Sequence, residues 1–222
     1  MKKSGVLLKA TSLYLIYFLY TYFAGYISIL FKNIDNNLVM LGLDVLFLIG
    51  IIIAYKKTLK ADFEKIKKEY SFKRIIKIIF LGFLSIVLLN IVIAALGTLL
   101  FSDVNMDQNT QSIQNLASLS MIYTIFKTMI FGVVAEELLF RESLNEVIDN
   151  NILFVLITAI IYTAMNFVFT TATFSISQIL AYFLPALLFG VIYIKNKRNI
   201  ILVMMTKFAY NLIPLIILLS GI

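Results

Sequence analysis

Residues 131–145 read FGVVAEELLFRESLN, and the interpretation of the whole chain depends on this stretch. Two adjacent carboxylates, Glu136 and Glu137, lie in an otherwise apolar run, and Arg141 follows four residues after Glu137. Residues four apart share a helix face. Ionisable side chains are costly inside a membrane helix, so such a group predicts a functional site.

The composition of the chain is that of a membrane protein. Of its 222 residues, 61% are hydrophobic and 14% are charged, whereas about a quarter of the residues in a soluble domain are charged. The apolar residues fall into blocks of about 18–25, the length of a helix that crosses the hydrocarbon core. We therefore predict an all-α fold, a polytopic transmembrane helical bundle that has the lipid bilayer as its main partner.

Seven spans are predicted, at residues 8–31, 38–55, 73–101, 119–140, 152–170, 177–194 and 199–220. Lys and Arg gather at the N-terminus, in residues 56–77 and at residues 195–198, and the intervening connections hold few of them. The positive-inside rule then places the N-terminus in the cytoplasm and the C-terminus outside.

The net charge of +7 thus reflects topology, and no nucleic-acid partner is expected. The Lys-, Asn- and Ile-rich usage suggests a bacterial plasma membrane.

The spans form one integral membrane unit with two parts. Residues 1–118 hold N-terminal transmembrane helices, a basic cytoplasmic segment at 56–77 and a polar outer loop at 102–118, and residues 119–222 hold the core helices. The basic segment is either a solvated loop or a short amphipathic helix on the cytoplasmic leaflet, because apolar residues recur in it at helical spacing. These apolar residues are Leu59, Phe63, Ile66 and Tyr70.

Other polar residues within the spans are expected to find partners on neighbouring helices. Asp44 and Lys127 lie at similar depths in the second and fourth spans, so we predict that they pair. Asn90, near the middle of the third span, is predicted to hydrogen-bond a neighbouring helix.

Two further spans carry polar pairs with a spacing of four residues. Tyr162 and Asn166 form one pair in the fifth span, and Lys207 and Asn211 form the other in the seventh. Together with the glutamates of the fourth span, three helices present polar groups that we expect to face one another.

EELLFR resembles the EExxxR motif of the CPBP family, the CAAX proteases and bacteriocin-processing enzymes, also called the Abi family. The resemblance extends from Phe126 to the C-terminus, where KFAYN stands at the place of the family's HxxxN motif. It implies an all-helical intramembrane endopeptidase in which glutamates and two histidines surround a water molecule or a metal ion. Carried over by motif, Glu136 and Glu137 are the carboxylate pair and Arg141 orients them.

Both histidines of the family are replaced in this chain, which contains no histidine and no cysteine. Asn166 stands at the first histidine position, with Tyr162 in place of the phenylalanine of that motif. Lys207 stands at the second, and Asn211 keeps its asparagine. A protonated lysine has no lone pair for a metal, so we expect no metal ion and no other cofactor. We predict that Lys207 pairs with the glutamates instead.

Three functions remain open. The first is a catalytically degenerate protease homologue that acts as a membrane scaffold, regulator or bacteriocin-immunity-type protein through another membrane protein or peptide. The second is a metal-independent endopeptidase that cleaves CAAX-like or leader peptides. In it Glu136 or Glu137 is the general base, and Asn166, Asn211 or Lys207 donates to the oxyanion. The third is a small transporter or lipid-handling protein that uses the polar cavity.

Overall fold

The computed structural model describes residues 3–31, 34–101, 120–168 and 176–220, and in these ranges all regular secondary structure is helical. The all-α prediction is therefore confirmed for the described residues. The long helices are α1 (Lys3–Leu30), α2 (Asn36–Glu69), α3 (Phe72–Phe101), α8 (Asn151–Val168), α9 (Ile176–Lys195) and α10 (Ile200–Ser220). The predicted polar outer loop at 102–118 lies outside these ranges.

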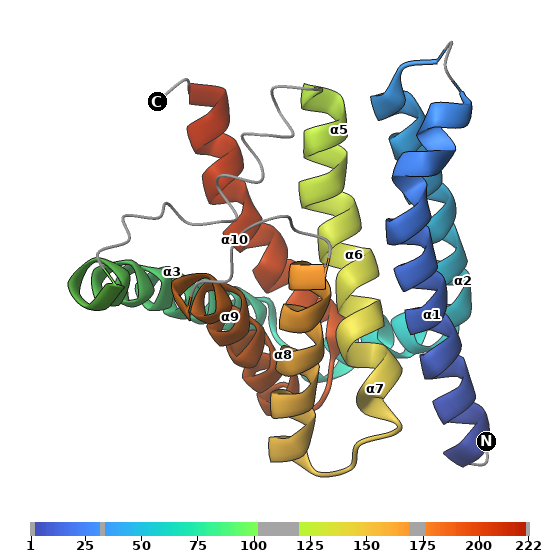
Figure 1. Ribbon diagram of the computed structural model, residues 1–222. Coiled ribbons are helices and arrows are strands. Elements are labelled where there is room, and N and C mark those ends of the chain that lie inside the picture. The colour runs from blue at the N-terminus through green and yellow to red at the C-terminus, as the bar shows by residue number, and fades with distance from the viewer. Residues whose placement is uncertain (1–2, 32–33, 102–119, 169–175, 221–222) are drawn as a thin grey trace.

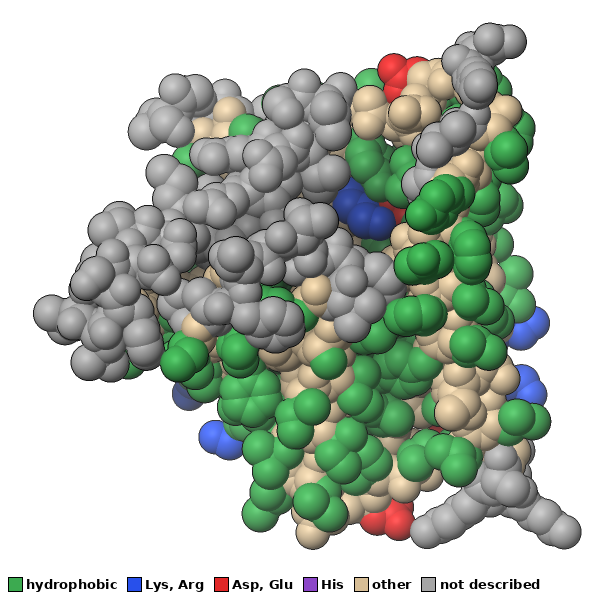
Figure 2. Space-filling model, viewed as in Figure 1, with side chains coloured by type: hydrophobic (Ala, Val, Ile, Leu, Met, Phe, Trp, Pro, Cys, Tyr) green, Lys and Arg blue, Asp and Glu red, His purple; other side chains and the backbone are tan. Residues whose placement is uncertain are grey.

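The described helices support a multi-pass membrane protein. Five of them, α1, α2, α3, α9 and α10, are long and apolar enough to cross a bilayer, and α8 is apolar but shorter. Figure 1 shows α1, α2 and the α5–α7 run side by side, with α3 crossing the view beside α9. Figure 2 shows hydrophobic side chains over the outward face of α1, where Leu8 and Leu15 are exposed. A helix face of this kind suits contact with lipid.

The fourth predicted span, 119–140, lies on a helical run that is not a regular α-helix throughout. The structure has an uninterrupted helical run that changes its hydrogen-bonding pattern, with the segments α5 (Met121–Ile125), η1 (Phe126–Phe131), α6 (Gly132–Glu137), η2 (Leu138–Glu142) and α7 (Ser143–Asn145). The two η segments are π-helical, with hydrogen bonds to the residue five positions back.

Gly132 ends the first π-helical segment. Its N–H donates to the carbonyl of Lys127, and a Cβ atom at Gly132 would lie only 3.2 Å from that same oxygen. The missing side chain therefore permits the close backbone approach at this turn. The two π-helical segments lie directly before and after α6, which ends in Glu136 and Glu137.

Helix α2 does not end with the second predicted span but continues through the basic segment to Glu69. Ile66 and Tyr70 are buried there, as their spacing predicts, and Leu59 is partly buried. Phe63 is 48% exposed, so it does not belong to the inner face. Asp62 takes a place on that face, and the segment is a helix packed on the protein rather than a separate helix on the lipid surface.

The C-terminal half of α2 holds the turn between α9 and α10. A carboxylate oxygen of Asp62 accepts from the N–H of Ile200 at 2.7 Å, at the first residue of α10. The amide of Asn199 donates to the carbonyl of Asp62 at 3.0 Å, and the hydroxyl of Tyr70 donates to the carbonyl of Asn196. These bonds fix where α10 begins, and α10 in turn packs against α3, α9, α6 and α2.

Both predicted polar contacts outside the central cluster are present. Lys127 Nζ lies 2.9 Å from each carboxylate oxygen of Asp44, which is fully buried and also accepts from the hydroxyl of Tyr123 at 3.1 Å. The amide of Asn90 donates to the hydroxyl of Tyr210 on α10 at 2.5 Å.

Candidate functional site: a buried ion-pair network

Four charged side chains from two helical segments meet inside the bundle. Lys207 Nζ on α10 lies 2.9 Å from Oε2 of Glu136 and 3.0 Å from Oε1 of Glu137. Arg141 Nη1 donates to Oε2 of Glu137 at 2.5 Å, one turn along the same helical run. Two carboxylates and two cations therefore neutralise one another, and the predicted pairing of Lys207 with the glutamates is present.

The members of this network differ in how deeply they are buried. The side chain of Glu137 has no exposed surface and that of Arg141 keeps 2%, whereas that of Glu136 keeps 21%. Lys207 donates a hydrogen bond to Glu136, while its contact with Glu137 is an ion pair without hydrogen-bond geometry. Charges this deeply buried are tolerated only when they are paired, and Glu137 has both Lys207 and Arg141 as partners.

Helix α9 supplies groups that the sequence did not reveal. The carbonyl of Ala186 accepts from Arg141 Nη2 at 3.2 Å. The ring of Phe189 lies 5.4 Å from the Arg141 guanidinium and 5.9 Å from Lys207 Nζ, within the range of cation–π attraction. Phe189 belongs to no sequence motif, so the sequence does not distinguish it from the other phenylalanines of the chain.

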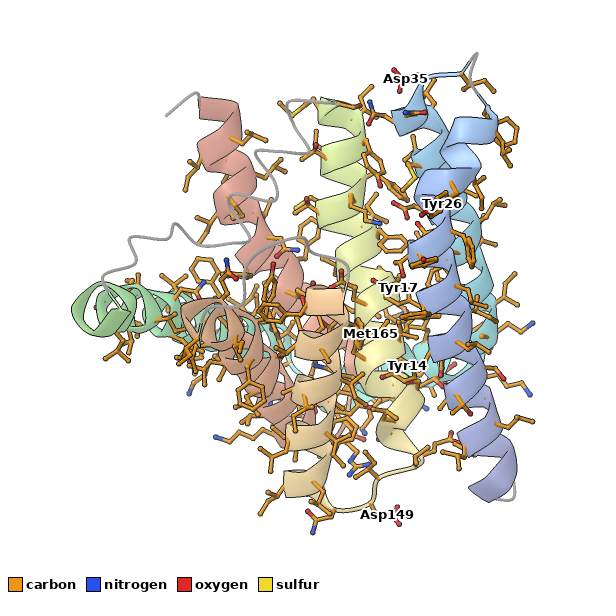
Figure 3. All side chains as sticks on the ribbon, viewed as in Figure 1. Tyr14, Tyr17, Tyr26, Asp35, Asp149 and Met165 are labelled. Atoms are coloured by element: carbon orange, nitrogen blue, oxygen red, sulfur yellow. The ribbon has the colours of Figure 1, made fainter. Side chains whose placement is uncertain are left out.

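Tyrosines and phenylalanines form the apolar wall around the network. Tyr162 lies with its ring 5.4 Å from Lys207 Nζ and packs edge-on against Phe140. From α1, Tyr14 and Tyr17 point toward α6 and η2 (Figure 3), and both rings contact Phe140. Helix α1 therefore contributes to the enclosure of the site, although its sequence carries no motif.

The two asparagines of the predicted site donate to backbone carbonyls and not to the charged groups. Asn211 donates to the carbonyl of Thr128 at 2.9 Å, which ties α10 to the segment before α6. Asn166 donates to the carbonyl of Tyr162 on its own helix at 2.8 Å. Of the six predicted site residues, four are joined by direct ion pairs: Lys207 with Glu136 and Glu137, and Arg141 with Glu137. Asn211 lies one turn beyond Lys207, and Asn166 bonds within α8.

The residues at this site do not fit a divalent cation. The chain has no histidine or cysteine to serve as a ligand, and no set of three candidate ligands converges among the described residues. The ammonium of Lys207 lies against both carboxylates that a metal ion would need. A second positive charge in that space would be repelled.

A further buried carboxylate lies just beyond the fourth predicted span. Glu142 keeps 4% of its surface, accepts from the hydroxyl of Tyr193 at 2.7 Å and from the amide of Asn145 at 3.3 Å. Burial raises the pKa of Glu142, and the two hydrogen bonds offset this only in part.

The fold and the site together define a class: a polytopic helical membrane protein with a charge-balanced network in its core. Residues 116–213 match the sequence model of the family described as "Type II CAAX prenyl endopeptidase Rce1-like". Over these residues the chain is therefore similar to the CAAX prenyl endopeptidases of the CPBP family, and the resemblance predicted from the EELLFR motif is confirmed for this part of the chain. Comparison with curated proteins and with solved structures gave no match.

Proposed function

We propose that this chain is a catalytically degenerate CPBP-family protein of the bacterial plasma membrane that acts by binding another membrane protein or peptide. A scaffold, a regulator and a bacteriocin-immunity-type protein all fit this description. The observation that carries the proposal is the position of Lys207 Nζ, 2.9 Å from Glu136 and 3.0 Å from Glu137. The lysine contacts both carboxylates on which hydrolysis would depend.

A carboxylate acts as a general base through its free lone pairs and a pKa suited to taking a proton from water. Lys207 lies against one oxygen of each glutamate and Arg141 lies against the other oxygen of Glu137, so these cations compete with water for the carboxylate lone pairs. The amides of Asn166 and Asn211 each donate to a backbone carbonyl, so neither is arranged around a substrate oxygen. The network instead connects α10 to the helical run that contains α6.

One observation favours a metal-independent endopeptidase as the second candidate. The side chain of Glu136 keeps 21% of its surface, whereas that of Glu137 keeps none. Glu136 is thus the carboxylate of the pair that water can reach, and it would be the general base in this alternative.

A cleavage assay separates the two candidates. Wild-type protein and Glu136→Gln are reconstituted in lipid nanodiscs and incubated with a farnesylated CAAX-type peptide and, separately, with a leader-bearing peptide. We expect the same background hydrolysis for both proteins. Hydrolysis by the wild type that is lost in Glu136→Gln would overturn the degenerate assignment and support the endopeptidase.

A binding experiment tests the positive side of the proposal. Tagged wild-type protein, Glu136→Gln and the exposed-site control Glu64→Gln are each crosslinked in native membranes and purified. We expect the same partner set for all three, because a scaffold does not require the basicity of Glu136. Loss of all partners in a folded Glu136→Gln protein would contradict the scaffold function.

A further inference from the structure

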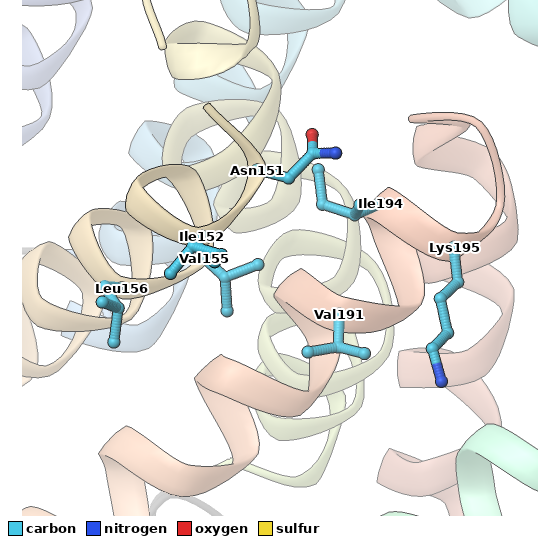
Figure 4. Close-up of a pocket in the computed structure, with 7 residues that line it drawn as sticks. All are labelled: Asn151, Ile152, Val155, Leu156, Val191, Ile194 and Lys195. Carbon is cyan, nitrogen blue, oxygen red and sulfur yellow. The ribbon is translucent and has the colours of Figure 1, made fainter. Parts of the chain in front are cut away.

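A groove between α8 and α9 lies apart from the ion-pair network and opens to the outside of the bundle. Its volume is about 340 Å³, within the range of small-ligand sites. The apolar lining comes from both helices (Figure 4) and consists of Ile152, Val155, Leu156, Val191 and Ile194. Asn151, the first residue of α8, and Lys195, the last residue of α9, border the groove with the apolar parts of their side chains.

The groove lies beside a close contact between the two helices. A Cβ atom at Gly190 would lie 3.3 Å from a methyl group of Val155 and 3.4 Å from its Cα atom. Val155 and Val191, the neighbours of this contact, form the wall of the groove. The opening therefore results from rigid helix packing and not from a mobile loop.

The surroundings of the groove are apolar and lipid-facing. On α8, Ile152 is 72% exposed and Ile160 is 55% exposed. A bilayer supplies acyl chains at such a surface, and an apolar slot between two helices gives one chain more contact than a flat helix face does. The shape and lining fit a hydrocarbon chain.

Lys195 places a positive charge beside the groove. It is exposed at the end of α9 that we predict to be cytoplasmic, and no carboxylate pairs with it in the described part of the chain. The neighbouring cations are occupied: Lys197 pairs with Glu69 at 2.5 Å, and Arg198 donates to several acceptors in the turn before α8, among them Asn145 and Asn151. Lys195 is thus available to an anion at the mouth of the groove.

We propose that this groove is a binding site for an anionic phospholipid of the cytoplasmic leaflet. One acyl chain lies between α8 and α9, and the headgroup phosphate pairs with Lys195. The proposal is independent of the function of the ion-pair network, since no residue of that network lines the groove. A neutral hydrocarbon ligand would not account for the unpaired cation at the end of the slot.

A photolabelling experiment tests the site. Protein in mixed micelles is exposed to phosphatidylglycerol that carries a diazirine on one acyl chain, and labelled peptides are mapped by mass spectrometry. We expect label in residues 152–156 and 191–194, competed by unlabelled phosphatidylglycerol but not by phosphatidylcholine. Lys195→Gln should weaken the labelling about fivefold, because one lysine at a membrane surface contributes on that scale. Lys57→Gln removes an exposed lysine elsewhere and should leave labelling unchanged.

A second variant keeps the test independent of the charge. Val191→Phe fills the groove and should abolish the labelling, with folding checked by thermal melting. Equal competition by phosphatidylcholine would show ordinary annular lipid and overturn the proposal. Unchanged labelling in Lys195→Gln would do the same, and so would competition by a neutral isoprenoid alcohol with none by phosphatidylglycerol.

Discussion

Lys207 supplies the positive charge between Glu136 and Glu137, with Nζ 2.9 and 3.0 Å from one oxygen of each. At the corresponding position of the family motif the resemblance implies a histidine. A neutral imidazole has a lone pair that can bind a metal, whereas an ammonium group has none. The proposed non-catalytic function rests on this replacement, which places an ammonium group between two helical elements.

Lys207→Met should destabilise the protein strongly. The variant keeps an apolar stem of similar length but leaves two carboxylates to share Arg141. Removal of one partner from a buried pair costs about 3–5 kcal/mol, and the partial exposure of Glu136 places the expected loss near the lower end. Thermal melting in nanodiscs measures it.

The matched double variant Lys207→Met with Glu136→Gln should recover part of the lost stability, since it removes one of the unpaired carboxylates. Equal melting temperatures for the wild type and Lys207→Met would show that the lysine does not stabilise the glutamates.

Glu142 predicts a pH dependence of stability with a definite sign. Burial raises its pKa above the usual value of 4.5, so the folded protein binds the proton more tightly than the unfolded chain does. Stability contributed by this group is therefore lost as pH rises from about 4.5 to the raised pKa. Melting curves across this interval should show a smaller decline for Glu142→Gln than for the wild type. Identical pH profiles would contradict the assignment.

At the scale of the elements, close packing sets the position of α10. A Cβ atom at Gly82 on α3 would lie 2.6 Å from the Thr206 methyl group and 3.1 Å from Ile192. The Thr206 hydroxyl donates to the carbonyl of Leu202, which fixes that side chain. Thr206 precedes Lys207, so the α3–α10 contact also positions the network.

Gly82→Ala should therefore destabilise the protein, by about 1–3 kcal/mol as is typical of overpacking. Gly42→Ala is the matched control, because a Cβ atom there would meet nothing within 4 Å. Alanine favours a helix over glycine by about 1 kcal/mol, so Gly42→Ala should leave the melting temperature unchanged or raise it. A Gly82→Ala protein as stable as the control would contradict the packing described.

Sequence patterns predicted the long helices and the main polar contacts. Apolar blocks long enough to cross a bilayer form helices, and charged side chains inside the membrane need partners. The Asp44–Lys127 pair and the contact of Lys207 with the glutamates followed from this reasoning. The π-helical segments beside α6 could not be predicted, since they depend on tertiary packing against α2 and α10. The same holds for the Phe189 ring and the Ala186 carbonyl, which carry no local signal.

At the scale of the whole molecule, the prediction that remains to be tested is the orientation in the membrane. Figure 3 shows Asp35 and Asp149 at opposite ends of the bundle, and the charge distribution predicts that the Asp35 end is outside. The natural chain has no cysteine, so a single introduced thiol reports one position without background.

Asn36→Cys should react with a membrane-impermeant maleimide in intact cells. Lys57→Cys should react only after the membrane is permeabilised. Both residues are exposed in the structure, so burial does not account for a difference. The reverse labelling pattern would show that the orientation is wrong, and with it the assignment of the groove between α8 and α9 to the cytoplasmic leaflet.

The central claim is that the ammonium of Lys207 occupies the place of a metal ion between Glu136 and Glu137. Zinc content of purified protein, measured by elemental analysis after incubation with zinc and removal of excess, tests it most directly. The wild type should retain no stoichiometric zinc. Asn166→His combined with Lys207→His should gain zinc affinity, because it removes the competing cation and adds two neutral ligands. Stoichiometric zinc in the wild type, lost in Glu136→Gln, would contradict the account.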